Sequence, residues 1–231
     1  KQRSGDIIAF GHPKCDAVAY GEVYELPGFP EDRYYYMHND RYSPKGWYAY
    51  AVPMGNGLVE IVNCVSRPNE SRCKELFRRL LRENAFLKGH VENKRPVSAF
   101  GGFGGVDYPK TAKRGGSLLV GEAAGFQDVS RGFGIAYALR SGHLAARALL
   151  ENLDYDRLWK KSFDAELKLD FATRFALSVF GDRLVEWYFR DTKDNGNIDF
   201  NDATPKGLFF DIGREIAFPA EMMKKRILGH W

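Results

Sequence analysis

The chain has 231 residues, 44% of them hydrophobic and 28% charged, which is typical of a globular protein of one or two domains. Its formal net charge of +4 comes from basic residues spread among nearly as many acidic ones, and this argues against a nucleic-acid partner. The three cysteines, Cys15, Cys64 and Cys73, form neither a disulfide framework nor a metal-ligand spacing, and no apolar run is long enough to span a membrane. We therefore expect a cytoplasmic protein.

The first third of the chain is rich in β-forming residues and predicts an antiparallel sheet of about four strands. Gly, Pro, Asn and Asp separate the strand segments from one another. Residues 53–57 read Pro-Met-Gly-Asn-Gly, and the Asn-Gly pair suits the positive φ angles of a hairpin turn. The expected strands are residues 17–25, 34–37, 46–52 and 58–65.

Residues 71–84 change to a helical period. An apolar stripe lies opposite several arginines, and Asn69 or Ser71 is the expected N-cap. Residues 91–100 are expected to return to the sheet, before a run of glycines at 101–105. The apolar stripe consists of Cys73, Leu76, Phe77, Leu80 and Leu81, and the arginines are Arg78, Arg79 and Arg82.

Residues 117–142 predict a strand, a turn of small residues, a polar loop and a helix. The apolar run 118–120 ends in Gly-Glu-Ala-Ala-Gly, whose small side chains let a bound group approach the backbone. Gly132 and Gly134 leave the unpaired N–H groups of the helix start accessible, and such a terminus attracts anions and carbonyl oxygens. Glu122 is a candidate acceptor for ligand hydroxyl groups. These residues by themselves predict a ligand-binding loop. The alternative is a turn that serves tight packing only.

From Leu144 onward the pattern is almost wholly helical. Large apolar residues at every fourth position predict a ridge in the core, with the wall of a lipid pocket as the alternative. The basic run 224–226 lies beside apolar residues and is expected to be a solvated helix end, with peripheral contact to an anionic membrane as the alternative. Small residues on the preceding helix predict a smooth face that packs on a sheet. The ridge is Trp159, Phe163, Leu167, Phe171, Phe175 and Val179, and the small residues are Ala138, Gly142 and Ala146.

The stretch from Gly121 to Ala146 resembles the second FAD-binding motif of the para-hydroxybenzoate hydroxylase-like flavoproteins, and most of all the geranylgeranyl reductase family. That pattern is Gly-Asp-Ala-Ala-Gly-Phe, a Pro, Gly-Glu-Gly-Ile, and a helix with Ala and Ser-Gly. Residues 46–53 resemble the family's Gly-Tyr-x-Trp-x-Phe-Pro strand, which lines the substrate cavity. The resemblance implies that FAD contacts Gly121, Glu122, Ala123, Gly125, Gly132, Phe133, Gly134 and Ile135, and that Tyr48, Tyr50 and Pro53 wall the cavity.

Several positions depart from this pattern. Glu122 replaces the family's Asp, Val129 its Pro and Phe133 its Glu. The family also begins with a βαβ unit carrying Gly-x-Gly-x-x-Gly, and neither the residues before position 17 nor the glycines at 101–105 fit that unit. We therefore expect the chain to be the C-terminal part of a flavoprotein, partnered by an N-terminal FAD-binding half and binding FAD weakly without it.

The resemblance implies an α/β fold and an FAD-dependent oxidoreductase. The expected domains are an antiparallel-sheet substrate domain at 1–110, part of an FAD-binding domain at 111–152 and a helical region at 153–231. The implied reaction is reduction of a carbon–carbon double bond in an isoprenoid or other apolar substrate, with NAD(P)H or ferredoxin as electron donor. A flavin monooxygenase or halogenase on the same scaffold and a non-catalytic binding module are the alternatives.

Other constellations carry less chemistry. Residues 191–202 have the outline of an EF-hand loop, but Lys193 takes a ligand position and Asp202 replaces the bidentate Glu, which argues against calcium. The five histidines show no metal spacing, so no metal is expected. Asp128 and Arg131 are expected to face the flavin edge, where Arg131 would favour anionic reduced flavin, with a surface loop as the alternative. No residue stands out as a general base, which fits chemistry carried by a cofactor.

Overall fold

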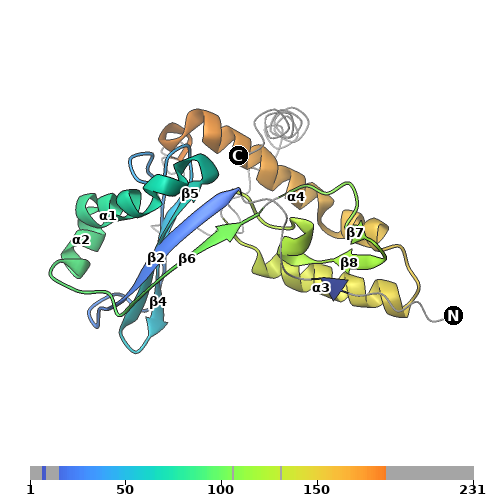
Figure 1. Ribbon diagram of the computed structural model, residues 1–231, viewed down its shortest axis with the longest axis horizontal. Coiled ribbons are helices and arrows are strands. Elements are labelled where there is room, and N and C mark those ends of the chain that lie inside the picture. The colour runs from blue at the N-terminus through green and yellow to red at the C-terminus, as the bar shows by residue number, and fades with distance from the viewer. Residues whose placement is uncertain (1–6, 9–15, 106, 131, 186–231) are drawn as a thin grey trace. The chain divides into compact units, whose positions relative to one another are not determined.

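The computed structural model describes residues 7–8, 16–105, 107–130 and 132–185 (Figure 1). These residues form two compact units. The sheet unit contains residues 16–103 and 176–185, and the turn–helix unit contains residues 7–8 and 104–175. Within the part of the chain that is described, no helix is both long enough and apolar enough to cross a bilayer.

The sheet unit contains a five-stranded sheet in the order β3-β4-β5-β2-β6. The pairs β2–β5, β3–β4 and β4–β5 are antiparallel, so the predicted antiparallel sheet is confirmed. An edge strand that begins later than expected, β6, completes it. The strands are β2 (Ala17–Glu25), β3 (Tyr35–Met37), β4 (Ala49–Gly55), β5 (Leu58–Ser66) and β6 (Ser98–Gly104).

The turn between β4 and β5 is the hairpin that the Asn-Gly pair predicts. Gly55 pairs with Leu58 across it, which leaves a two-residue loop. Its residues Asn56 and Gly57 have φ angles of 54° and 72°, as a type I′ turn requires. The turn fixes the register of β4 and β5 and so determines which side chains share a face.

Two helices follow β5. The 3₁₀ segment η1 (Arg67–Arg72) leads directly into α1 (Cys73–Glu83), and no side chain caps α1. The expectation that Asn69 or Ser71 caps this helix is therefore wrong, because both residues lie inside η1. The second helix, α2 (Ala85–Val91), is not among the elements expected from the sequence; its N-cap is Asn84, whose Oδ1 accepts the N–H of Leu87 at 3.0 Å.

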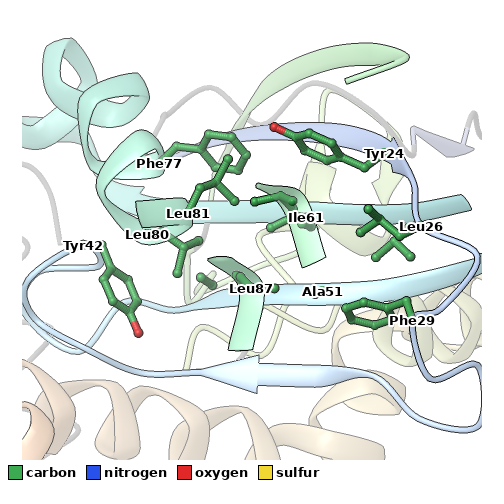
Figure 2. Packing of buried hydrophobic residues seen from close by; sticks show 13 residues of the cluster. Tyr24, Leu26, Phe29, Tyr42, Ala51, Ile61, Phe77, Leu80, Leu81 and Leu87 are labelled. Carbon is green, nitrogen blue, oxygen red and sulfur yellow. The ribbon is translucent and has the colours of Figure 1, made fainter. Parts of the chain in front are cut away.

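The core of the sheet unit lies between these helices and one face of the sheet (Figure 2). All five residues of the predicted apolar stripe on α1 are buried, which confirms that prediction. Phe77 and Leu80 have no exposed surface, and full burial of such a side chain stabilises a fold by about 1.5–3 kcal/mol. They meet every second side chain of each strand. The residues between these positions point to the opposite face of the sheet. The labelled strand residues of this core are Tyr24, Ala51 and Ile61.

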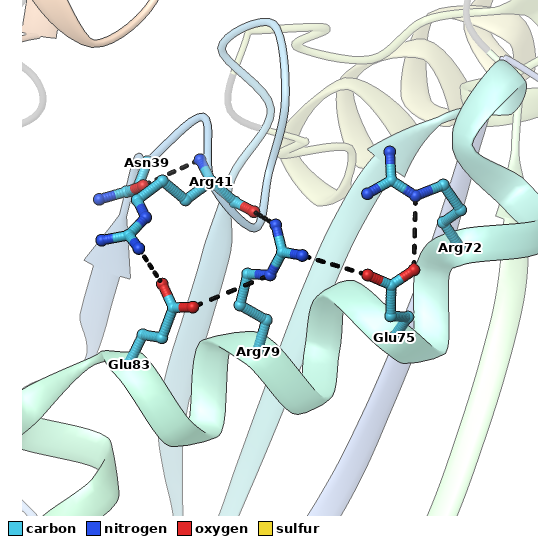
Figure 3. A network of polar contacts seen from close by, with 6 residues as sticks. All are labelled: Asn39, Arg41, Arg72, Glu75, Arg79 and Glu83. Atoms are coloured by element: carbon cyan, nitrogen blue, oxygen red, sulfur yellow. Dashed lines mark hydrogen bonds and ion pairs between the residues drawn. The ribbon is translucent and has the colours of Figure 1, made fainter.

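An ion-pair network joins α1 to the loop after β3 (Figure 3). Arg79 donates Nη2 to Glu75 Oε1 at 3.2 Å and Nη1 to the carbonyl of Arg41 at 3.1 Å. Arg41 in turn pairs with Glu83 at 3.1 Å. Because each of these side chains is about one third exposed or more, each pair contributes at most about 1 kcal/mol, and the network positions the loop more than it stabilises the fold.

The turn–helix unit contains a small sheet in the order β1-β8-β7. β1 pairs parallel with β8, although residues 7–8 are expected from sequence in the sheet domain. β8 continues into a 3₁₀ turn, η2, and two helices follow. The elements are β1 (Ile7–Ile8), β7 (Lys113–Arg114), β8 (Ser117–Leu119), η2 (Gly121–Ala124), α3 (Ile135–Leu150) and α4 (Tyr155–Phe180), of which the last five residues, 176–180, belong to the sheet unit.

The predicted ridge on α4 is core packing along its first part. Trp159, Phe163, Leu167 and Phe171 are at most 1% exposed, whereas Val179 is 56% exposed. The rings of Trp159 and Phe163 lie 4.9 and 5.0 Å from the ring of Phe126, which belongs to the segment after η2. The ridge therefore packs against the segment that contains the candidate ligand loop. Core packing is confirmed for its first four members, whereas Phe175 is only partly buried and Val179 is exposed.

The two cysteines that the structure describes should resist thiol reagents in the native protein. Burial raises the pKa of Cys64 to about 12 and of Cys73 to about 11. Because the thiolate is the reactive form, only about one Cys73 side chain in 1,000 is reactive at pH 8. Disulfide-exchange labelling of a Cys15→Ser variant at pH 8 should give no reaction before unfolding and two thiols in urea. Rapid native labelling would show that one thiol is accessible.

Candidate functional site

The predicted order of strand, small-residue turn, loop and helix is confirmed in the turn–helix unit. β8 ends at Leu119, η2 follows directly, and Gly125 closes the turn in the left-handed region with φ 82°. The nine residues from Phe126 to Gly134 separate the turn from α3, which begins at Ile135. All of the sequence-predicted cofactor residues lie on this one stretch.

The small residues of the turn divide into an inward and an outward set. Gly121 and Gly125, with Ala123, are buried and shape the turn. A Cβ atom on Gly121 would lie 3.1 Å from the Cβ of Ala138, and one on Gly125 would lie 2.6 Å from the backbone nitrogen of Asp107. These glycines are therefore required for packing, whatever ligand the turn faces.

Glu122 belongs to the outward set. Its side chain is exposed, and its Oε1 accepts the backbone N–H of Gly105 at 3.1 Å. This bond joins the turn to the end of the glycine run that the sequence analysis left without a role. It holds the carboxylate of this exposed residue in place. Nothing in the local sequence signals a contact across 17 residues.

Asp128 does not face outward as expected from the sequence. It is only 3% exposed, and its Oδ1 accepts the N–H and the Oγ–H of Ser130 at 2.9 and 2.6 Å. Its own N–H donates to the carbonyl of Phe133, and its carbonyl accepts from Gly132. Asp128 thus closes the loop before α3 and shapes it from inside. Arg131, the other residue expected at the flavin edge, lies outside the described residues.

The N-terminus of α3 is open. Its N-cap, Gly134, has no side chain to cap it, and the first helical bond runs from the N–H of Ala138 to the carbonyl of Gly134. The N–H groups of Ile135, Ala136 and Tyr137 consequently have no acceptor within the helix. Phe133 is 43% exposed beside them. The helix dipole makes this end attractive to an anion or a carbonyl oxygen.

Hydrogen bonds from beneath hold α3 in position. The N–H of Gly121 donates to Ser141 Oγ at 2.9 Å, and the hydroxyl of Tyr137 donates to Asp170 Oδ2 at 2.6 Å. Burial and the carboxylates of Asp170, Asp128 and Glu166 raise the pKa of Tyr137, so its hydroxyl stays a donor at ordinary pH. Sequence analysis missed both contacts, which depend on side chains from separate elements.

The aromatic residues expected at the substrate cavity lie in the sheet unit. Tyr48, just before β4, stacks on Tyr36 with ring centroids 5.1 Å apart, and Tyr50 shares its side of the sheet by strand alternation. Pro53 belongs to the alternate set with Ala51, whose face α1 and α2 cover. The structure brings Tyr48 and Tyr50 together and places Pro53 on the other face.

Metal ligation has no support in the described part of the chain, where no group of three or more His, Cys, Asp or Glu residues could hold an ion. The EF-hand-like stretch at 191–202 and the basic end at 224–226 lie outside the described residues.

Comparison with known proteins identifies the class of fold. No protein-family model matches the chain. A crystal structure of a geranylgeranyl bacteriochlorophyll reductase-like protein from Thermoplasma acidophilum matches 92% of this chain and 55% of its own, with a TM-score of 0.63 and 18% identity. The flavin-dependent halogenase CmlS matches 93% of this chain and 45% of its own, with a TM-score of 0.57 and 15% identity. The described fold is therefore part of the fold of FAD-dependent oxidoreductases.

Among curated proteins, an uncharacterised protein of Methanocaldococcus jannaschii is 26% identical over 168 residues, which are 68% of this chain and 42% of that protein. The chain thus spans less than half of this relative and about half of the solved flavoproteins above. This chain has no counterpart to the remaining part of each of those proteins.

The packing role of the turn glycines predicts opposite effects of one substitution at two positions. Gly125→Ala should destabilise the protein by more than about 2 kcal/mol, because alanine combines a left-handed φ with a clash on Asp107. Gly142→Ala on α3 should stabilise it by about 0.5–1 kcal/mol, since nothing lies within 4 Å of the added Cβ. Urea unfolding of both variants beside the parent measures the difference. Equal stabilities would contradict the described turn.

Proposed function

We propose that the chain supplies the flavin-facing turn and the substrate domain of an FAD-dependent oxidoreductase that reduces a carbon–carbon double bond of an isoprenoid or another apolar substrate. The observation that carries the proposal is that the open N-terminus of α3 and the exposed carboxylate of Glu122 belong to one stretch of strand, turn and helix, which follows a strand in a parallel pair. The proposed cofactor contacts are Gly121, Glu122, Ala123, Gly125, Gly132, Phe133, Gly134 and Ile135.

The exposed groups of the site fit the polar parts of FAD. Glu122 would accept a hydrogen bond from a ligand hydroxyl through Oε2, because Oε1 already accepts one from the N–H of Gly105. The N–H groups of Ile135 and Ala136 suit a carbonyl oxygen or a phosphate. When bound, FAD would supply the hydride, with NAD(P)H or ferredoxin as the donor that reduces it. Gly121 and Gly125 have no side chain, so such a group can come close to the backbone of the turn.

The aromatic side of the sheet suits an apolar substrate. Tyr48 is 6% exposed, and Val62 and Cys64 beside it are 1% and 7% exposed. Burial raises the pKa of Tyr48 well above its usual value, so its hydroxyl stays uncharged at ordinary pH, and the hydroxyl of Tyr50 donates to the carboxylate of Glu60 on the same face at 3.3 Å. A largely aromatic and apolar lining favours a hydrocarbon over a polar metabolite. Peripheral contact with a membrane would then serve to collect such a substrate.

A monooxygenase or halogenase is the second candidate. It is favoured by the match to CmlS and by a triple mutant of the flavin-dependent brominase Bmp2, which matches 93% of this chain with a TM-score of 0.56 and 12% identity. Oxygen consumption separates the two activities in the assembled enzyme: a halogenase or monooxygenase requires oxygen for each turnover, whereas a double-bond reductase works without it.

Binding of FAD should depend on Glu122. We expect weak binding by the chain alone, and Glu122→Ala should lower the affinity about tenfold because a hydrogen bond to a charged acceptor is lost. Flavin fluorescence quenching, with FAD titrated to millimolar concentration, measures the affinity. Glu31→Ala, which removes an exposed carboxylate in the sheet unit, is the matched control.

Equal affinities of the Glu122→Ala and Glu31→Ala variants would contradict the placement of the cofactor at this turn. If FAD fails to bind the parent chain both alone and together with the unmatched part of the Methanocaldococcus jannaschii relative, a non-catalytic binding module is the better description.

A further inference from the structure

Helix α3 carries two apolar faces, of which only one is buried. Ser141 and Ala145 belong to the buried face, together with Tyr137 and Ala148. The second face is exposed and begins at the open N-terminus: Ile135 is 79%, Leu139 70% and Leu150 86% exposed. We call it the open face of α3, and with its small residues it consists of Ile135, Leu139, Gly142, Ala146 and Leu150.

The spacing of these residues makes one continuous stripe. Ile135, Leu139, Gly142, Ala146 and Leu150 follow at intervals of four, three, four and four residues in the printed sequence, which is the helical period of a single face. A helix at the surface of a finished domain normally shows charged residues to water. Here the charges lie on the remaining side, where they are already paired. The pairs are Arg140 with Glu166 and Arg147 with Glu151.

The small residues of the stripe leave room for another backbone. The sequence predicts that Ala138, Gly142 and Ala146 pack on a sheet. Ala138 meets the Gly121 turn, whereas Ala146 is exposed and nothing lies within 4 Å of a Cβ built on Gly142. The packing partner that this smooth face suits is therefore absent from the described part of the chain. The expectation that this face packs on a sheet is therefore wrong for the described residues, although the regular spacing of small residues that led to it is present.

The small sheet of the same unit also has an edge strand, β1, which pairs with β8 and has no further strand beside it among the described residues. Parallel strands occur almost always in larger sheets that are covered on both faces, yet Ile7 of β1 is 45% exposed. An open parallel edge and an open apolar helix face in one compact unit both point to a missing part of an α/β domain.

We infer that the open face of α3 is the docking surface for the polypeptide that completes this α/β flavin domain, extending the sheet beyond β1. The inference rests on the proposed function, and it names the surface on which the FAD-binding half would assemble. It is supported by the solved flavoproteins, since 45% of the Thermoplasma acidophilum chain has no counterpart here. An apolar stripe with a small-residue seam suits a closely packed, permanent partner rather than a transient one.

The test is co-expression of the tagged chain with the unmatched part of the Methanocaldococcus jannaschii relative, with no FAD added. We expect the two to co-purify. Leu139→Glu places a charge on the stripe, and Gly142→Leu fills the seam while keeping it apolar. Each should weaken the complex about tenfold or more. The matched controls are Met54→Glu, at a residue that is 59% exposed, and Gly89→Leu, at a helical glycine with open space around it.

The Gly142→Leu variant decides between docking and unspecific adhesion. Adhesion to an apolar patch would persist or increase with leucine, whereas a fitted partner is lost. Failure of the parent to co-purify, or equal binding by Gly142→Leu and Gly89→Leu, would overturn the inference. So would a dimer of the chain alone, seen by sedimentation, that Leu139→Glu dissociates, because the occupant would then be a second copy. A complex that forms but binds no FAD would leave the docking face standing and contradict the proposed function.

Discussion

The close approach of the Gly121 turn to α3 is the constraint on which the candidate site depends. A Cβ on Gly121 would lie 3.1 Å from that of Ala138, its φ of 53° also favours glycine, and its N–H donates to Ser141 Oγ of the helix itself. Strand end, turn and helix are thereby held as one piece. Because the turn is fixed from inside, Glu122 and the first N–H groups of α3 are presented on the outside in a constant arrangement, which is what preorganised binding requires.

Local pattern predicts the elements of this protein well, because hydrophobic period and turn chemistry act over a few residues. The Asn56-Gly57 hairpin, the stripe on α1 and the order of turn, loop and α3 follow from the sequence in this way. The cap of α1 was wrong because η1 extends the helical region upstream of Cys73.

What sequence reasoning could not find are contacts that tertiary packing creates. The bond from Gly105 to Glu122 and the inward turn of Asp128 join or reorient groups whose neighbours in sequence give no signal. The face of α3 shows the limit most plainly. Its small-residue period correctly indicates close packing, but a single chain cannot show whether the packing partner is its own sheet or another polypeptide.

The most direct test of the account is hydrogen–deuterium exchange of the chain with and without saturating FAD. If the turn and the helix start form part of a flavin site, protection on adding FAD should be confined to residues 121–125 and 132–138, with the Glu122→Ala variant losing it. Protection in the sheet unit alone, or none at a concentration where fluorescence shows binding, would contradict the placement of the cofactor.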